Sequence, residues 1–215
     1  MPLITLILSL VIYLSFIIFS PLLHPVSASP QWIIDGDVLN IANNNDTRFA
    51  VTPHALAPSL TFHNDTPYVT WAEINSKGLS IVYVKHKEGK EWVDDGEPLN
   101  LSMNNNASFP AIASAGNRLY AAWTEGDEKK VNQIYVREWN GSEWKQVGGS
   151  LNADPLNHAS TPVISGDKSL LYAAWTEIGS NNVSHLYVKQ GDGNSWRLIG
   201  DKINKVTERH ALTPS

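Results

Sequence analysis

The chain of 215 residues contains no cysteine. Disulfide bonds, thiolate metal sites and a cysteine nucleophile are therefore excluded together. Clusters of lysine and arginine are also missing, and the formal net charge at pH 7 is -5. Because a surface that binds nucleic acid needs clustered basic side chains, we expect no nucleic-acid partner. Charged residues make up 17% of the chain and hydrophobic residues 42%, which indicates a globular protein.

Lysine and arginine are absent from the one long apolar run, which extends from Leu3 to Leu23. The small residues 26–28 that follow are typical of a signal-peptidase site, although an export signal normally begins with a basic residue. The run is also long enough to span a bilayer as a helix. Residues 1–28 are therefore either a cleaved export signal or an uncleaved N-terminal anchor. Both alternatives predict a secreted or extracytoplasmic protein that touches the membrane only through this segment.

Tryptophan, with eight residues, is unusually frequent, and its spacing reveals an internal repeat. Each repeat places a Trp-(Ala or Thr)-Glu segment before a Tyr-Val-basic segment and a Trp-x-x-x-Gly segment. At an offset of 52 residues, without any insertion, the following sets align: Pro58, Pro110, Pro162 and Pro214; Trp71, Trp123 and Trp175; Glu73, Glu125 and Glu177; Tyr83, Tyr135 and Tyr187; Trp92, Trp144 and Trp196; Gly96, Gly148 and Gly200; Asn100, Asn152 and Asn204. A period of about 50 residues indicates a repeat architecture.

Each repeat is predicted to form four short strands. In the second repeat these are Pro110–Ala115, Leu119–Glu125, Asn132–Glu138 and Glu143–Val147. An Asn140-Gly141 pair separates the last two, and Asn-Gly between β-type segments is a strong hairpin signal. Apolar or aromatic residues occupy both faces of the middle strands, and no segment beyond the N-terminal run has a helical period. The sequence therefore predicts an all-β protein.

Four-stranded units in tandem, with both faces buried, are typical of a β-propeller, in which each antiparallel sheet is a blade that packs on its neighbours. An open β-solenoid is the alternative, although its coils are usually much shorter. Residues 29–53 are predicted to be a closing strand, matching the end of a repeat, and a polar loop. Three blades are predicted at 54–105, 106–157 and 158–209, and the start of a further blade at 210–215. Because propellers typically have about 4–8 blades, we expect an incomplete ring, truncated at the C-terminus.

The hairpins of the repeat resemble degenerate Asp-box hairpins of sialidase-type (Asp-box, or BNR) β-propellers. An Asp-box reads Ser-x-Asp-x-Gly-x-x-Trp. The chain keeps the glycine and the tryptophan, and departs at the aspartate, at these positions: Gly89, Gly141 and Gly193; Trp92, Trp144 and Trp196; Lys87, Trp139 and Gly191. The resemblance implies a propeller fold and covers essentially all of 31–215. Sialidase catalysis would need an arginine cluster, a tyrosine nucleophile backed by glutamate, and an aspartate acid/base, and no arginine of this chain matches that cluster.

Glu125 and its repeat equivalents have two alternative interpretations. They could ring a channel and bind a cation or sugar hydroxyls, or each could cap a turn by accepting backbone N–H bonds, which identical recurrence favours. Arg137 shares its repeat position with Lys85 and Lys189, which suggests a solvated or blade-edge cation. Trp139 has no repeat equivalent and lies on a hairpin, so it is the aromatic residue that we most expect to be exposed.

Three histidines, with Asn106 at the fourth equivalent place, open the first strand of the repeats. They are His54, His158 and His210. Since that strand lines the axis of a propeller, these imidazoles could converge on a metal, but one per blade is too dispersed for ordinary ligand spacing. We therefore expect no metal and no cofactor. The recurrent tryptophans could stack on sugars, but their mid-strand positions favour core packing.

Taken together, these patterns predict an exported, non-enzymatic propeller that binds a glycan or an extracellular protein. Its candidate binding residues are Trp139, Arg137 and Glu125. One alternative is a glycoside hydrolase or sialidase-like enzyme whose catalytic residues lie in missing blades. Another is a purely structural segment of a surface or adhesion protein.

Overall fold

The computed structural model of the chain describes residues 39, 55–206 and 208–215. All of them belong to one compact unit, Asp35–Ser215. The segment predicted as an export signal or anchor at 1–28 lies outside the described residues, as does His54. So does the predicted closing strand and loop at 29–53, except for Leu39. Within the described part, no helix is long and apolar enough to cross a membrane.

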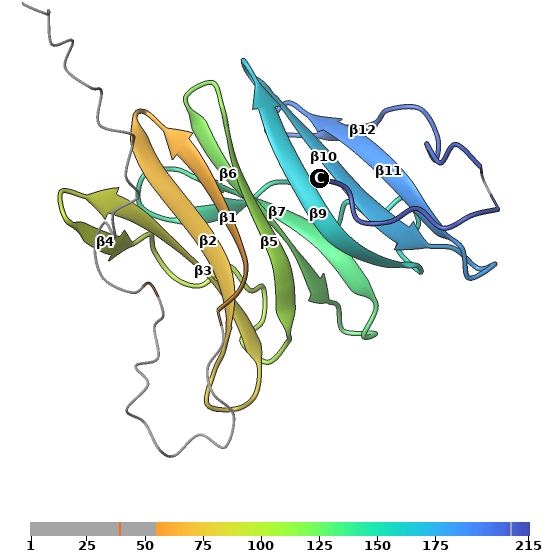
Figure 1. The fold of residues 1–215 in the computed structure, drawn as a ribbon, viewed down its shortest axis with the longest axis horizontal. Helices are drawn as coiled ribbons and strands as arrows, with labels where there is room; N and C mark the ends of the chain where they lie inside the picture. The colour runs from red at the N-terminus through yellow and green to blue at the C-terminus, as the bar shows by residue number, and fades with distance from the viewer. Residues whose placement is uncertain (1–38, 40–54, 207) are drawn as a thin grey trace, which may run out of the picture. The chain divides into compact units, whose positions relative to one another are not determined.

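Three antiparallel sheets of four strands follow one another along the chain (Figure 1). The first sheet holds β1 (Ala55–His63), β2 (Thr66–Ile74), β3 (Ser80–Glu88) and β4 (Glu91–Asp94). The second holds β5 (Ala107–Ala115), β6 (Arg118–Gly126), β7 (Asn132–Trp139) and β8 (Trp144–Gln146). The third holds β9 (His158–Asp167), β10 (Leu170–Ile178), β11 (Ser184–Gly191) and β12 (Trp196–Leu198). Each sheet is a meander with its strands in sequence order, and the inner strands β1, β5 and β9 are neighbours. The predicted all-β propeller fold is confirmed.

The recurrent tryptophans form the core of the blades. Trp71 is 2% exposed, and Trp123 and Trp175 are fully buried. Each indole lies against the tyrosine opposite it on the next strand, as between Trp123 and Tyr135, whose ring centroids are 6.1 Å apart. Burying an indole removes about 150–250 Å² from water, worth about 4–6 kcal/mol before entropy is counted. The interpretation of these three residues as core is confirmed.

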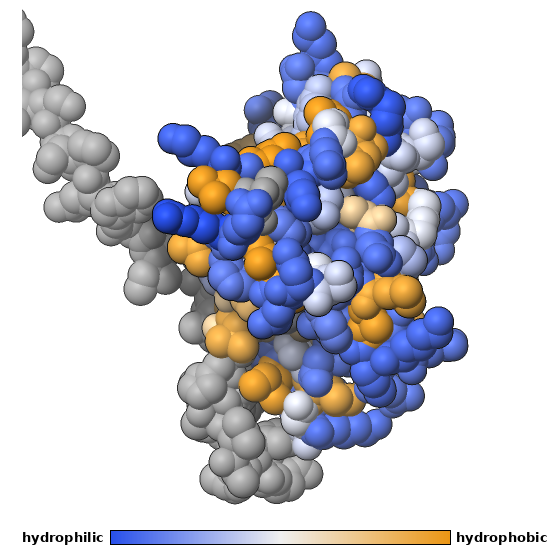
Figure 2. Space-filling view, turned by 90° about the vertical axis from the view of Figure 1, so that its right-hand side faces the viewer, coloured by the Kyte–Doolittle hydropathy of each residue, from blue (hydrophilic) through white to orange (hydrophobic). Residues whose placement is uncertain are grey.

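The outer face of the third blade is partly exposed. Ile203 is 50% exposed, whereas Leu151, its equivalent in the second blade, is buried against the third. Val206 and Leu212 are exposed as well. Figure 2 views this side of the molecule and shows hydrophobic side chains in several patches among hydrophilic ones. In the first two blades the corresponding face packs against the next blade, whereas in the third blade this face is accessible to solvent.

Candidate functional site

Two of the recurrent glutamates, Glu125 and Glu177, lie between blades. The Glu125 carboxylate, 1% exposed, accepts a hydrogen bond from Trp123 Nε1 at 2.8 Å. Both of its oxygens also accept backbone N–H groups of the preceding blade, from Leu101 at 2.8 Å and Ser102 at 2.9 Å. These hydrogen bonds join the second blade to the first. The structure places Glu125 inside a blade junction, and the turn-capping interpretation is confirmed.

The same junction recurs one blade later. Glu177 accepts the backbone N–H groups of Ala153 at 2.8 Å and Asp154 at 2.9 Å. Trp175 Nε1 donates to the same carboxylate at 3.2 Å. Glu125 and Glu177 thus accept equivalent backbone and indole N–H groups, and each carboxyl group joins its blade to the preceding one.

Arg137 lies over the Trp123 ring, with its guanidinium carbon 5.7 Å from the ring centroid. Burial lowers the pKa of Arg137, and the charge of Glu125 opposes that shift. Lys189 takes the same place over Trp175, at 5.8 Å. A cation stacked on an indole stabilises by about 0.5–2 kcal/mol. The recurrence shows Arg137 as part of the blade packing.

Trp139 lies half-buried against the first blade. Its ring is 5.3 Å from that of Trp144, centroid to centroid, at an interplanar angle of 42°. A Cβ added at Gly96, whose φ is 72°, would lie only 3.1 Å from Cζ3 of Trp139. Glycine is therefore required there both by its left-handed backbone and by the indole above it. We expected Trp139 to be exposed because it lies on a hairpin, but its indole is half-buried because the ring packs against the first blade.

His158, at the start of β9, and its repeat equivalent His210 bind backbone groups. His158 Nδ1 accepts the N–H of Asn132 at 3.1 Å, and His210 Nδ1 accepts the N–H of Ser184 at 3.1 Å. Asn106 Oδ1 performs the same task for the N–H of Ser80. Among the described residues, no group of three or more side chains could hold a metal ion. These residues recur because each accepts the backbone N–H group at the start of the third strand of a blade, namely β3, β7 or β11.

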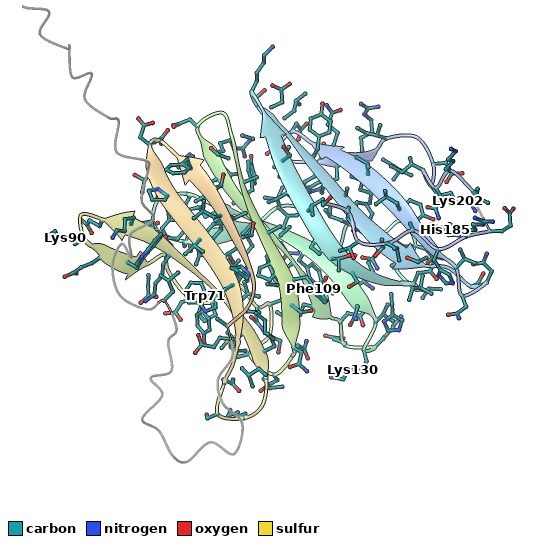
Figure 3. All side chains as sticks on the ribbon, in the orientation of Figure 1. Trp71, Lys90, Phe109, Lys130, His185 and Lys202 are labelled. Atoms are coloured by element: carbon teal, nitrogen blue, oxygen red, sulfur yellow. The ribbon has the colours of Figure 1, made fainter. Side chains whose placement is uncertain are left out.

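A cavity of about 480 Å³ opens where the inner strands come together. Equivalent residues of four successive repeats line it: Ala57, Pro58 and Ser59; Phe109, Pro110 and Ala111; Thr161, Pro162 and Val163; Thr213 and Pro214. We call it the axial cavity. Phe109 is 45% exposed and is labelled on β5 in Figure 3.

The wall of the axial cavity is shaped by an irregularity in each inner strand. The register of β5 against β6 shifts between Ser108 and Ala111. Phe109 has a φ of 51° there, and its equivalents Ala57 and Thr161 have 48° and 53°. Such left-handed residues each cost about 1–3 kcal/mol and cluster at functional sites. Sequence reasoning missed this site, and the signal that could have found it was the set of aligned prolines.

The lining of the axial cavity combines apolar surface with a few polar groups. Proline rings and Phe109 offer C–H and aromatic surface, and the hydroxyl-bearing residues Ser59, Thr161 and Thr213 lie among them. Ser59 Oγ accepts the N–H of Ile112 at 3.2 Å, and Thr161 Oγ1 lies 3.3 Å from Thr176 Oγ1. None of the described residues that line the cavity carries a carboxylate or an imidazole. These side chains supply apolar contact and hydroxyl hydrogen bonds, but no acid or base.

No protein-family model and no curated protein matches the chain. Solved structures do. An α-L-arabinanase of Penicillium chrysogenum complexed with arabinobiose is 14% identical, with a TM-score of 0.53 over 71% of this chain and 51% of that one. The GH93 α-L-arabinofuranosidase of Fusarium graminearum, also with arabinobiose, is 15% identical, with a TM-score of 0.53 over 73% and 50%. A thermostable family-43 glycoside hydrolase is 15% identical, with a TM-score of 0.53 over 76% and 54%.

These matches show the fold, which is that of propeller glycoside hydrolases. The chain spans about half the length of those proteins. The resemblance to sialidase-type propellers is confirmed for the propeller fold. Its finer part is not supported by the three structures named above, which are arabinan-active or family-43 enzymes and not Asp-box proteins. This agrees with the aspartate position of the hairpins, which holds Lys87, Trp139 and Gly191.

Proposed function

We propose that the chain is a non-enzymatic propeller module that binds an oligosaccharide in the axial cavity. The observation that supports this most is the contrast between the cavity and the recurrent carboxylates. The cavity presents proline rings, Phe109 and hydroxyl groups, whereas Glu125 and Glu177 are saturated by backbone donors. Ligand sites are mostly apolar hollows with a few polar groups that fix orientation.

Two matching structures hold arabinobiose, which supports a glycan as the ligand over a protein. The volume of about 480 Å³ lies within the usual range of ligand pockets. The apolar run within 1–28 supports export, which would give the module access to extracellular glycans. A glycoside hydrolase is the second candidate, and the fold of its neighbours favours it.

Binding should depend on Phe109. We expect immobilised full-length chain to retain arabino-oligosaccharides, and Phe109→Ala to weaken that binding about tenfold, which corresponds to about 1.4 kcal/mol. Leu156→Ala is the matched control, since Leu156 is 70% exposed and lies outside the cavity lining. Equal affinity of Phe109→Ala and the wild type would place the site elsewhere. Hydrolysis of the ligand by the wild type would favour the enzyme.

A further inference from the structure

A buried carboxylate breaks the repeat at the junction of the first and second blades. Asp95 occupies the position that Val147 and Ile199 hold in the next two repeats. Its side chain is only 3% exposed, so an acidic group fills a place that the repeat otherwise gives to a branched aliphatic side chain. A buried charge is costly unless it is paired and fully hydrogen-bonded.

Only one of the two carboxylate oxygens of Asp95 has a hydrogen-bond partner among the described residues. Its Oδ1 lies 2.9 Å from Nδ1 of His86, whereas Oδ2 finds no hydrogen-bond partner among the described residues. The backbone of Asp95 is held on both sides. Its N–H donates to the carbonyl of Val84 at 3.0 Å, and its carbonyl accepts Trp144 Nε1 of the second blade at 2.7 Å. The carboxylate is thus part of the contact between the two blades.

Among the described residues, the titratable groups that act on Asp95 belong to the first blade. They are His86 on β3, Tyr68 on β2, whose ring lies 5.4 Å from that of His86, and the adjacent Asp94. The second blade covers this place with the indoles of Trp139 and Trp144, which carry no charge. In the described part of the chain, His86 is thus the one side chain that compensates the Asp95 carboxylate, and it does so at Oδ1 alone.

We propose that Asp95 makes this junction a proton-dependent latch, which holds the second blade more firmly in mild acid than at neutral pH. A protonated carboxyl group is neutral and is tolerated beneath the indoles. An ionised Asp95 carboxylate favours a conformation in which its Oδ2 atom is hydrated by water. To reach water, Asp95 and Gly96 must move away from Trp139 and Trp144. Opening would therefore break the bond from Trp144 Nε1 to the Asp95 carbonyl.

The direction of the pH dependence follows from burial. Burial raises the pKa of Asp95 from 3.8 to about 6, and the charge and hydrogen bond of His86 oppose that shift. A carboxyl group whose folded pKa is raised contributes stability that is fully present below about pH 3.8. That contribution is lost as the pH rises toward 6. The junction should therefore loosen between pH 4 and 6, opposite to the usual effect of acid on paired carboxylates.

Hydrogen exchange of the indole N–H groups tests this proposal in the full chain. Trp144 and Trp196 donate to equivalent backbone carbonyls, those of Asp95 and Val147, so Trp196 is an internal control that lacks the acid. After correction for intrinsic rates, opening at Trp144 should rise at least tenfold from pH 4.5 to 7, and opening at Trp196 should not. In Asp95→Val both indoles should behave alike, and Asp95→Asn gives the same test should the valine variant fail to fold.

Two outcomes would overturn the latch. One is the same pH dependence at Trp144 and Trp196 in the wild type. The other is a pH dependence at Trp144 that survives in Asp95→Val or Asp95→Asn and disappears in His86→Gln, which copies Gln190 of the third blade. The second result would assign the effect to the imidazole.

Discussion

Glu125→Ala is expected to lower the free energy of unfolding by about 3–5 kcal/mol, as the loss of one side of a buried charged network does. The substitution leaves the buried indole N–H of Trp123 and the partly buried backbone N–H groups of Leu101 and Ser102 without their acceptor. An unsatisfied buried donor costs about 1–3 kcal/mol. Glu125→Gln should also lower the free energy of unfolding. Its amide would place an N–H₂ donor among the N–H donors of Trp123, Leu101 and Ser102, where an acceptor is needed. Urea unfolding followed by circular dichroism measures both.

Glu143→Ala is the matched control for this experiment. Glu143 is on the surface of the same blade, with a 65% exposed side chain 3.4 Å from Lys145 Nζ. Exposed ion pairs contribute about 0–1 kcal/mol, so the control should unfold close to the wild type. A Glu125→Ala variant as stable as Glu143→Ala would show that the carboxylate does not join the blades.

Gly166→Ala is expected to have an effect of similar size, by sterics alone. Gly166 lies on β9, and a Cβ at this position would overlap the backbone carbonyl oxygen of Ser114 on β5. It would also lie 2.7 Å from the Ala115 Cβ. Because backbone atoms cannot rotate away, the third blade would have to shift from the second. Overpacking of this kind costs about 1–3 kcal/mol and occasionally more, and we expect about 3 kcal/mol.

Gly149→Ala shows whether glycine replacement itself is harmful. A Cβ at Gly149 meets no atom within 4 Å, and its φ is not positive. Its stability should stay within about 0.5 kcal/mol of the wild type. Thermal unfolding of the two variants in parallel measures the difference, and equal melting temperatures would mean that β5 and β9 do not approach as closely as described.

The strands and the buried tryptophans were predictable from the sequence because the repeat shows each position three times. A residue that recurs at the same place in a strand, such as Trp123, must suit the same surroundings in each blade. The turn-capping role of Glu125 followed from the same reasoning. Its donors, Leu101 and Ser102, did not, because they belong to the preceding blade and only the packing of two blades brings them near.

The axial cavity could not be predicted because it depends on an unusual backbone. A residue before proline normally takes an extended conformation, yet Phe109 and its equivalents have positive φ. That local strain is held by the surrounding sheet and is invisible in a single sequence. The burial of Asp95 could not be predicted for another reason, since an acidic residue after a hairpin strand is ordinarily exposed. Trp139 was expected at the surface because its indole contact with the first blade is also a feature of tertiary packing.

One NMR titration tests both whether the axial cavity binds a glycan and whether that glycan stays uncleaved. Full-length chain labelled with ¹⁵N is mixed with arabino-oligosaccharides while the protein amides and the sugar anomeric signals are recorded together. We expect amide shifts at residues 57, 59, 109, 111, 161 and 163, with no new reducing-end signal over a day. Amide shifts confined to Trp139 and Arg137 would place the glycan outside the axial cavity, and new anomeric signals that grow with time would show cleavage.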